Sequence, residues 1–194
     1  MTGFFTSNCD FQAYSAVLNL MNDEHFAAFL EADISSHDLK IRDYLKDSKV
    51  LMVIFLRHFG CTYCRKTLAT YKSFSESQKD KMFSPLFIHM SSTHDGTKML
   101  ENYGLGGVAH ISDPEQELYK LFSLDRGSLL QHFGPAVLKK GIKDLFIHGV
   151  GSIKGDGFQM PGVFLVNEVG VIKSYIHTTV ADDVNFERLA QEAV

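Results

Sequence analysis

Two cysteines stand three residues apart in the tetrapeptide Cys61-Thr62-Tyr63-Cys64. Residues i and i+3 share one face of a helix, so the two sulfurs can reach each other and form a short disulfide. The chain holds one further cysteine, Cys9, among its 194 residues. A count this low and odd does not make a framework of structural disulfides, and it points instead to redox chemistry or to a metal site.

The segments around the pair favour redox chemistry. The apolar run from Val50 to Leu56 precedes it and predicts a strand buried on both faces, as in a central parallel sheet. A helix is expected from about residue 62 to 77, because Cys64 and Tyr71 bound a stretch with helical spacing. Cys61 then lies where a strand leads into a helix N-terminus, a place where backbone N–H groups stabilise an anion.

Nearby positive charge strengthens the case for a reactive thiol at Cys61. Each cation close to the sulfur would lower the pKa of the thiol further. We therefore predict that Cys61 ionises and attacks the substrate, and that Cys64, one turn deeper in the helix, resolves the intermediate. The basic residues that stand close in the sequence are Arg57, His58, Arg65 and Lys66.

Two other interpretations of the cysteine pair stay open, a structural zinc site and two inert core cysteines. Tetrahedral zinc needs four ligands, and His58 would add only one to the pair. The rest of the chain offers Cys9 and scattered histidines without a second paired motif. Cys9 itself is interpreted as a buried small hydrophobe rather than a second resolving thiol, because nothing around it is basic.

A further part of the site is expected far along the chain, at Met160-Pro161. This dipeptide precedes a predicted strand, and a cis proline at such a place is the usual structural partner of a dithiol pair. Only a minority of X-Pro bonds are cis, and the placement raises the expectation above that level.

The remaining pattern predicts an α/β sandwich with a mixed sheet, parallel in its first part and antiparallel at its end. The helix at 113–122 should start at Asp113, with Pro114 in its first turn and Gln116 reaching back to the cap. Gly104 should end the preceding helix in a left-handed conformation. Strands are expected at 85–90, 109–112, 162–166 and 171–176, and the last two are joined by a hairpin turn at 167–170, which begins with Asn167. Short helices are expected at 97–103 and 113–122, and a last helix around 186–190.

Two segments stand outside this pattern. Residues 1–37 have helical apolar spacing and predict one or two helices packed on a redox domain at 38–194. Residues 123–160 are rich in Gly and Lys with one amphipathic stretch, and they are interpreted as an insertion.

Composition excludes several classes of function. A net charge of -4 argues against nucleic-acid binding through bulk charge. No basic and apolar leader opens the chain, and its longest apolar run is too short to span a bilayer. We therefore expect a cytoplasmic protein with no membrane partner, no cofactor and no metal.

Three segments resemble one known group. Residues 55–65 (FLRHFGCTYCR), 124–129 (LDRGSL) and 160–165 (MPGVFL) are similar to recurring segments of the peroxiredoxin-like proteins of the AhpC/TSA group with C-x-x-C, which are related to selenoprotein L. The resemblance covers about residues 38 to 192. It implies a thioredoxin-like, peroxiredoxin-type three-layer α/β/α sandwich with thiol-dependent redox activity. It also implies a thiol reductant such as thioredoxin or glutathione, a peroxide or disulfide substrate, and an oligomer as one option.

The sequence departs from the usual peroxiredoxin motif P-x-x-x-T-x-x-C. His58 stands in place of the Thr and Ile54 in place of the Pro, so peroxide reduction and disulfide reduction both stay open, as does a non-catalytic thioredoxin-fold binding protein. Arg126 is a candidate for the peroxiredoxin arginine, or else a surface residue. We expect catalytic roles for Cys61, Cys64, Arg126 and His58, and substrate contacts from Thr62, Met160 and Pro161.

Overall fold

A five-stranded mixed sheet organises the chain. The computed structural model describes residues 23–78, 82–149 and 155–192, and the strands run in the order β5-β4-β3-β6-β7. β3 lies at the centre, parallel to β4 on one side and antiparallel to β6 on the other. This arrangement is the predicted mixed sheet. The strands are β3 (Val50–Phe55), β4 (Phe83–His89), β5 (Ala109–Ser112), β6 (Gly162–Asn167) and β7 (Gly170–Ile176).

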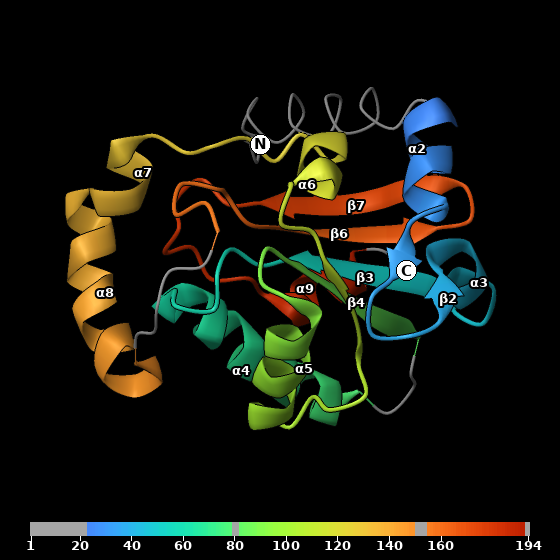
Figure 1. Ribbon diagram of the computed structural model, residues 1–194. Helices are drawn as coiled ribbons and strands as arrows, with labels where there is room; N and C mark the ends of the chain where they lie inside the picture. The colour runs from blue at the N-terminus through green and yellow to red at the C-terminus, as the bar shows by residue number, and fades with distance from the viewer. Residues whose placement is uncertain (1–22, 79–81, 150–154, 193–194) are drawn as a thin grey trace, which may run out of the picture.

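Helices cover both faces of this sheet, so the fold is the predicted three-layer α/β/α sandwich (Figure 1). Alternate side chains of β3 enter two separate cores. Leu51 and Val53 belong to the core under one helical layer, and Met52 and Ile54 to the core under the other. One layer holds α2 (Asp23–Leu30), α3 (Ile41–Lys46) and α6 (Glu117–Leu121), and the other holds α4 (Thr62–Ser77), α5 (Thr93–Asn102) and α9 (Phe186–Gln191).

The start of α6 differs from the prediction. The helix begins at Glu117, and Gln116 before it has a left-handed backbone with φ of 59°. Asp113 still caps it, because its carboxylate accepts hydrogen bonds from the N–H groups of Glu117 and Leu118 at 3.0 and 2.9 Å. A turn therefore separates the capping residue from the helix, and Pro114 lies in that turn.

Two local predictions are confirmed. Gly104 has a φ of 68°, the left-handed conformation expected just after α5. The side-chain oxygen of Asn167 accepts hydrogen bonds from the N–H groups of Val169 and Gly170, which closes the predicted hairpin turn between β6 and β7. α5 itself begins at Thr93, earlier than expected, because the Ser92 hydroxyl caps it by accepting from the N–H of Asp95.

The region interpreted as an insertion holds two helices, α7 (Leu129–Phe133) and α8 (Pro135–His148). They stand together at one side of the molecule, where α8 packs against α4 (left in Figure 1). Ser128 begins α7 with a capping box that it forms with Gln131. The two ends of the region meet at an isolated bridge between Arg126 and Gln159, and the N–H of Gly127 donates to the oxygen of Phe158.

The N-terminal segment is described only from residue 23, so Cys9 and the first part of the predicted helical segment 1–37 lie outside the described residues. The described part packs into the main core through Phe29 and Ile34. A small hairpin joins α2 to α3, formed by β1 (Asp33–Ile34) and β2 (Leu39–Lys40). In the ranges given above, no helix has both the length and the apolar character that a membrane span needs.

Candidate active site

The dithiol pair lies at the junction that the sequence predicts, where β3 leads into α4. Cys61 is the N-cap residue of α4, and its side chain is 7% exposed. Cys64 lies in the first turn of the helix and faces the core, with 3% exposure. Both thiols are free, so the structure shows the reduced dithiol. Cys61 is the more accessible of two buried sulfurs rather than a surface group.

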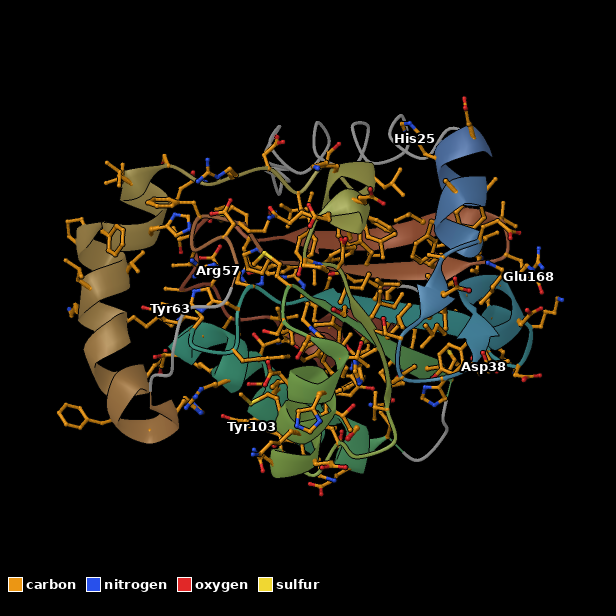
Figure 2. All side chains as sticks on the ribbon, viewed as in Figure 1. His25, Asp38, Arg57, Tyr63, Tyr103 and Glu168 are labelled. Carbon is orange, nitrogen blue, oxygen red and sulfur yellow. The ribbon has the colours of Figure 1, made fainter. Side chains whose placement is uncertain are left out.

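Arg57 contacts both sulfurs. Its guanidinium Nη1 donates a hydrogen bond to Cys61 Sγ at 3.2 Å, and its backbone N–H donates to Cys64 Sγ at 3.2 Å. Arg57 is only 5% exposed, and its guanidinium Nη2 donates to the backbone oxygen of Gly157. Figure 2 labels Arg57 at the end of the sheet that faces α8. The positive charge is thus buried beside the attacking sulfur.

The two thiols differ strongly in acidity. The hydrogen bond from Cys64, the charge of Arg57 and the backbone N–H groups of Cys64 and Tyr63 lower the pKa of Cys61 to about 6, against the opposing effect of burial. Burial raises the pKa of Cys64 well above its ordinary value, and the neighbouring Cys61 adds to this rise. At neutral pH the thiolate is therefore on Cys61, while Cys64 keeps its proton and donates to it.

His58 does not supply the positive charge that the sequence suggests. Burial, and then the charge of Arg57, lower the pKa of His58 to about 4, so its imidazole is neutral at pH 7. Its backbone oxygen accepts a hydrogen bond from the N–H of Cys61 at 2.9 Å, which fixes the turn before α4. Its Nδ1 is buried without a partner in the described residues.

The other two predicted cations point away from the sulfur. Arg65 donates to the backbone oxygens of Phe59 and His148. Lys66 pairs with two carboxylates, Asp144 at 3.1 Å and Asp183 at 2.9 Å. Of the four basic residues near the pair, Arg57 is the one that contacts Cys61.

Arg126 lies on the surface. Its side chain is 67% exposed, its Nε pairs with Asp156 at 2.6 Å, and its guanidinium stacks over the ring of Phe158. The guanidinium beside the thiol belongs to Arg57, which stands four residues before Cys61. The sequence signal for Arg57 was present, because it follows the buried strand directly. A catalytic role for Arg126 stays a prediction.

Met160 and Pro161 do lie near the pair in the fold, because Gly162 pairs with Phe55 at the end of β3. Their peptide bond is trans, as are all peptide bonds of the described residues, so the expected cis proline is wrong for this structure. Trans is the lower-energy isomer, and the preceding segment is held extended by the bridge at Gln159 and by the Met160 N–H, which donates to Asp125.

Thr62 joins α4 to the insertion rather than facing an open site. Its hydroxyl donates to the backbone oxygen of Gly149 at 2.8 Å. The next residue, Tyr63, donates its hydroxyl to the oxygen of Val137 at 2.8 Å, near the start of α8. Met160 packs in the same small cluster as Val137 and Tyr63. The roles in substrate binding that the sequence suggests for Thr62, Met160 and Pro161 stay predictions.

In the part of the chain that the structure describes, no group of three or more His, Cys, Asp or Glu side chains is placed to hold a metal ion. The pair of His89 and His110, 3.0 Å apart between Nε2 and Nδ1, is a buried hydrogen-bonded contact under α5. The geometry of the site is that of a dithiol.

Comparison with known proteins agrees with this fold. No family model matches the chain. A prostamide/prostaglandin F synthase of Xenopus tropicalis is 27% identical over 169 residues, which cover 81% of this chain and 80% of the relative. The solved bacterioferritin comigratory protein of Xanthomonas campestris, which reduces alkyl peroxides, has 13% identity and a TM-score of 0.58, covering 86% of this chain and 91% of its own.

A second kind of solved structure is also similar. A secreted disulfide oxidoreductase of Mycobacterium tuberculosis, homologous to DsbE of E. coli, has 9% identity and a TM-score of 0.53. It covers 89% of this chain and 98% of its own. The fold is therefore shared by peroxide-reducing and disulfide-exchanging proteins.

Proposed function

We propose that this chain, which has a peroxiredoxin-like thioredoxin fold, is a thiol oxidoreductase that cycles between dithiol and disulfide at Cys61 and Cys64. The observation that carries the proposal is the division of acidity within the pair. The hydrogen bond from Cys64 and the buried guanidinium of Arg57 hold Cys61 as a thiolate with a pKa of about 6, and Cys64, 3% exposed, keeps its proton. An attacking and a resolving thiol need this difference.

The leading substrate is a peroxide. The Cys61 thiolate attacks one peroxide oxygen, the O–O bond breaks, and the leaving alkoxide takes a proton to form an alcohol. Cys61 is then a sulfenic acid. The Cys64 thiol attacks its sulfur, a disulfide forms and water leaves. A dithiol such as thioredoxin, or two molecules of glutathione, returns two electrons and two protons.

Arg57 has a natural part in this step. Its Nη1 lies beside the attacking sulfur of Cys61. A guanidinium at this place can stabilise the negative charge that develops on a peroxide oxygen. It would therefore replace the Thr of the usual motif, which this chain lacks at position 58. The alkyl peroxide reduction of the Xanthomonas protein, which has a similar fold, supports a peroxide as the substrate.

A disulfide substrate is the second candidate. The Thr and Pro that usually hold and shield a peroxide are absent at positions 58 and 54, and the mycobacterial protein of similar fold is a disulfide oxidoreductase. In this reaction Cys61 forms a mixed disulfide with the substrate and Cys64 displaces the substrate thiol, so electrons and atoms balance without a sulfenic acid.

The experiment compares wild type with Cys61→Ser and Cys64→Ser on an alkyl hydroperoxide and on a small disulfide, with a thioredoxin system as reductant. Cys61→Ser should lose turnover, and Cys64→Ser should accumulate a sulfenic acid or a mixed disulfide, identified by mass spectrometry. Cys9→Ser serves as the matched control and should keep activity. Turnover of both substrates by Cys61→Ser at the wild-type rate would refute the proposal.

A further inference from the structure

The outward side of α7 and α8 carries large apolar side chains that the fold leaves in solvent. Their exposed fractions run from 56% to 86%. Large exposed apolar patches mark interaction sites. We call this set the α7–α8 surface; its members are Leu129, Leu130, Phe133, Leu138, Phe146 and Ile147.

The opposite side of α8 is the one that the fold uses. Val137 and Asp144 are each 4% exposed, and Gly141 lies one turn from each of them, against the hydroxyl of Tyr63. Asp144 also pairs with Lys66 of α4. These contacts hold α8 against α4 without the apolar side chains of the α7–α8 surface, which stay more than half exposed.

Charge on this segment differs in sign from the rest of the protein. Residues 129–148 contain three Lys and one Asp, a net charge of +2, whereas the whole chain carries -4 and the remainder therefore -6. The single carboxylate, Asp144, is buried and paired. Lys140 pairs with Asp183, which lies outside the segment, at 2.8 Å. Lys139 is exposed and is not in an ion pair with any of the described residues. The apolar side chains thus share their helices with positive charge.

We propose that the α7–α8 surface docks the protein on an anionic phospholipid membrane. Helices that lie in a membrane interface combine Lys with Phe and Leu, and their binding grows with buried apolar area and with attraction to anionic lipid. The two helices protrude at one side of the molecule, so a planar surface can reach them (Figure 1). This binding is peripheral, and the proposal differs from the expectation from sequence that the protein has no membrane partner.

Docking has a consequence for the dithiol. The first turn of α4 is tied to the inner side of the insertion, through Thr62 to Gly149 and through Tyr63 to Val137. One helix, about 10 Å in diameter, then separates Cys61 from the bound membrane. If the dithiol acts as proposed above, its substrates would then be molecules dissolved in the lipid or close to it. The docking itself does not depend on the thiol chemistry.

Vesicle sedimentation with the full-length chain tests the docking without any substrate. The wild type should sediment with vesicles of phosphatidylcholine and phosphatidylserine, more weakly with phosphatidylcholine alone, and less as salt increases. Phe146→Ser should weaken binding by about tenfold, because one buried aromatic side chain is lost. Lys139→Glu should weaken binding to the anionic vesicles only.

Val169→Ser is the matched control, since Val169 is 89% exposed but lies in the hairpin turn between β6 and β7. It should bind like the wild type, and all three variants should keep the wild-type melting temperature. Wild-type protein that fails to sediment with anionic vesicles would overturn the proposal. So would a Phe146→Ser effect confined to a monomer–dimer equilibrium in sedimentation velocity, which would identify the surface as an interface between copies.

Discussion

The guanidinium Nη1 of Arg57 lies 3.2 Å from Cys61 Sγ, and both residues are less than a tenth exposed. A buried positive charge at this distance interacts far more strongly with a thiolate than a surface charge would. Together with the hydrogen bond from Cys64, which has the larger effect, this contact lowers the pKa of Cys61 although burial of the thiol opposes its ionisation.

Replacing Arg57 with Met should raise the pKa of Cys61 above its value of about 6. The reason is the loss of the charge, while the backbone N–H that serves Cys64 is kept. Arg57→Lys keeps the charge without the planar guanidinium, so the pKa of Cys61 in this variant should lie between its values in the wild type and in Arg57→Met. The rate of iodoacetamide alkylation against pH measures each midpoint, and an unchanged midpoint in Arg57→Met would contradict the assignment.

The wild type should show a pH-dependent stability that comes from Cys61. Its pKa is lower in the folded state than its ordinary value, so its stabilising contribution is complete above the unfolded pKa and is lost as pH falls through about 6. Relative to Cys61→Ser, the free energy of unfolding should therefore rise by ~2 kcal/mol between pH 6 and pH 8. Urea unfolding under reducing conditions at both pH values checks this, and parallel curves would speak against it.

The anchor of α8 at Asp144 should be sensitive to loss of its charge. Asp144 is 4% exposed and pairs with Lys66, so Asp144→Asn should destabilise the protein by about 1–3 kcal/mol. Limited proteolysis should cut within 129–148 sooner than in wild type. Asp43→Asn, which removes an exposed ion pair with Lys46, is the control and should leave both measurements unchanged.

Gly96 is expected to tolerate no side chain. A Cβ at this position in α5 would lie 2.3 Å from His89 Nε2 and 2.9 Å from His110 Cε1, so the hydrogen-bonded imidazole pair would have to move. Gly96→Ala should lower stability by about 1–3 kcal/mol in thermal or urea unfolding. Gly106→Ala, where the nearest atom is 3.5 Å away, should be close to neutral. Equal stabilities of the two variants would exclude this packing argument.

The parts of the fold that could be predicted from sequence are those with strong local signals. The apolar run at β3 and the helical spacing after Cys61 define the strand and the helix on which the dithiol depends, and Asn167 signals its turn by itself. α6 begins later than expected because Asp113 caps it across a turn, which no periodicity reveals. The two-residue strands β1 and β2 are too short to show a pattern.

The arrangement of the site was less predictable than its location. Whether Arg57 or Arg126 reaches the sulfur depends on the paths of side chains after folding. The protonation state of His58 also depends on the folded structure. Burial and the charge of Arg57 lower its pKa, so the imidazole is neutral. The isomer at Pro161 depends on contacts of residues 124–126, which are distant in the sequence.

The bridge between Arg126 and Gln159 has a consequence for how this fold can change. The two ends of the segment 127–158 lie side by side, because the N–H of Gly127 donates to the oxygen of Phe158 and the bridge joins the two flanking residues. The part of this segment that faces solvent could change in length and content at little cost in loop-closure entropy. The contacts of Gly157 with Arg57, and of Val137 and Asp144 with the first turns of α4, would have to be kept. The central sheet therefore holds the dithiol, while the exposed part of residues 127–158 determines which surroundings the dithiol meets. A change in that part would place the same dithiol in a different environment.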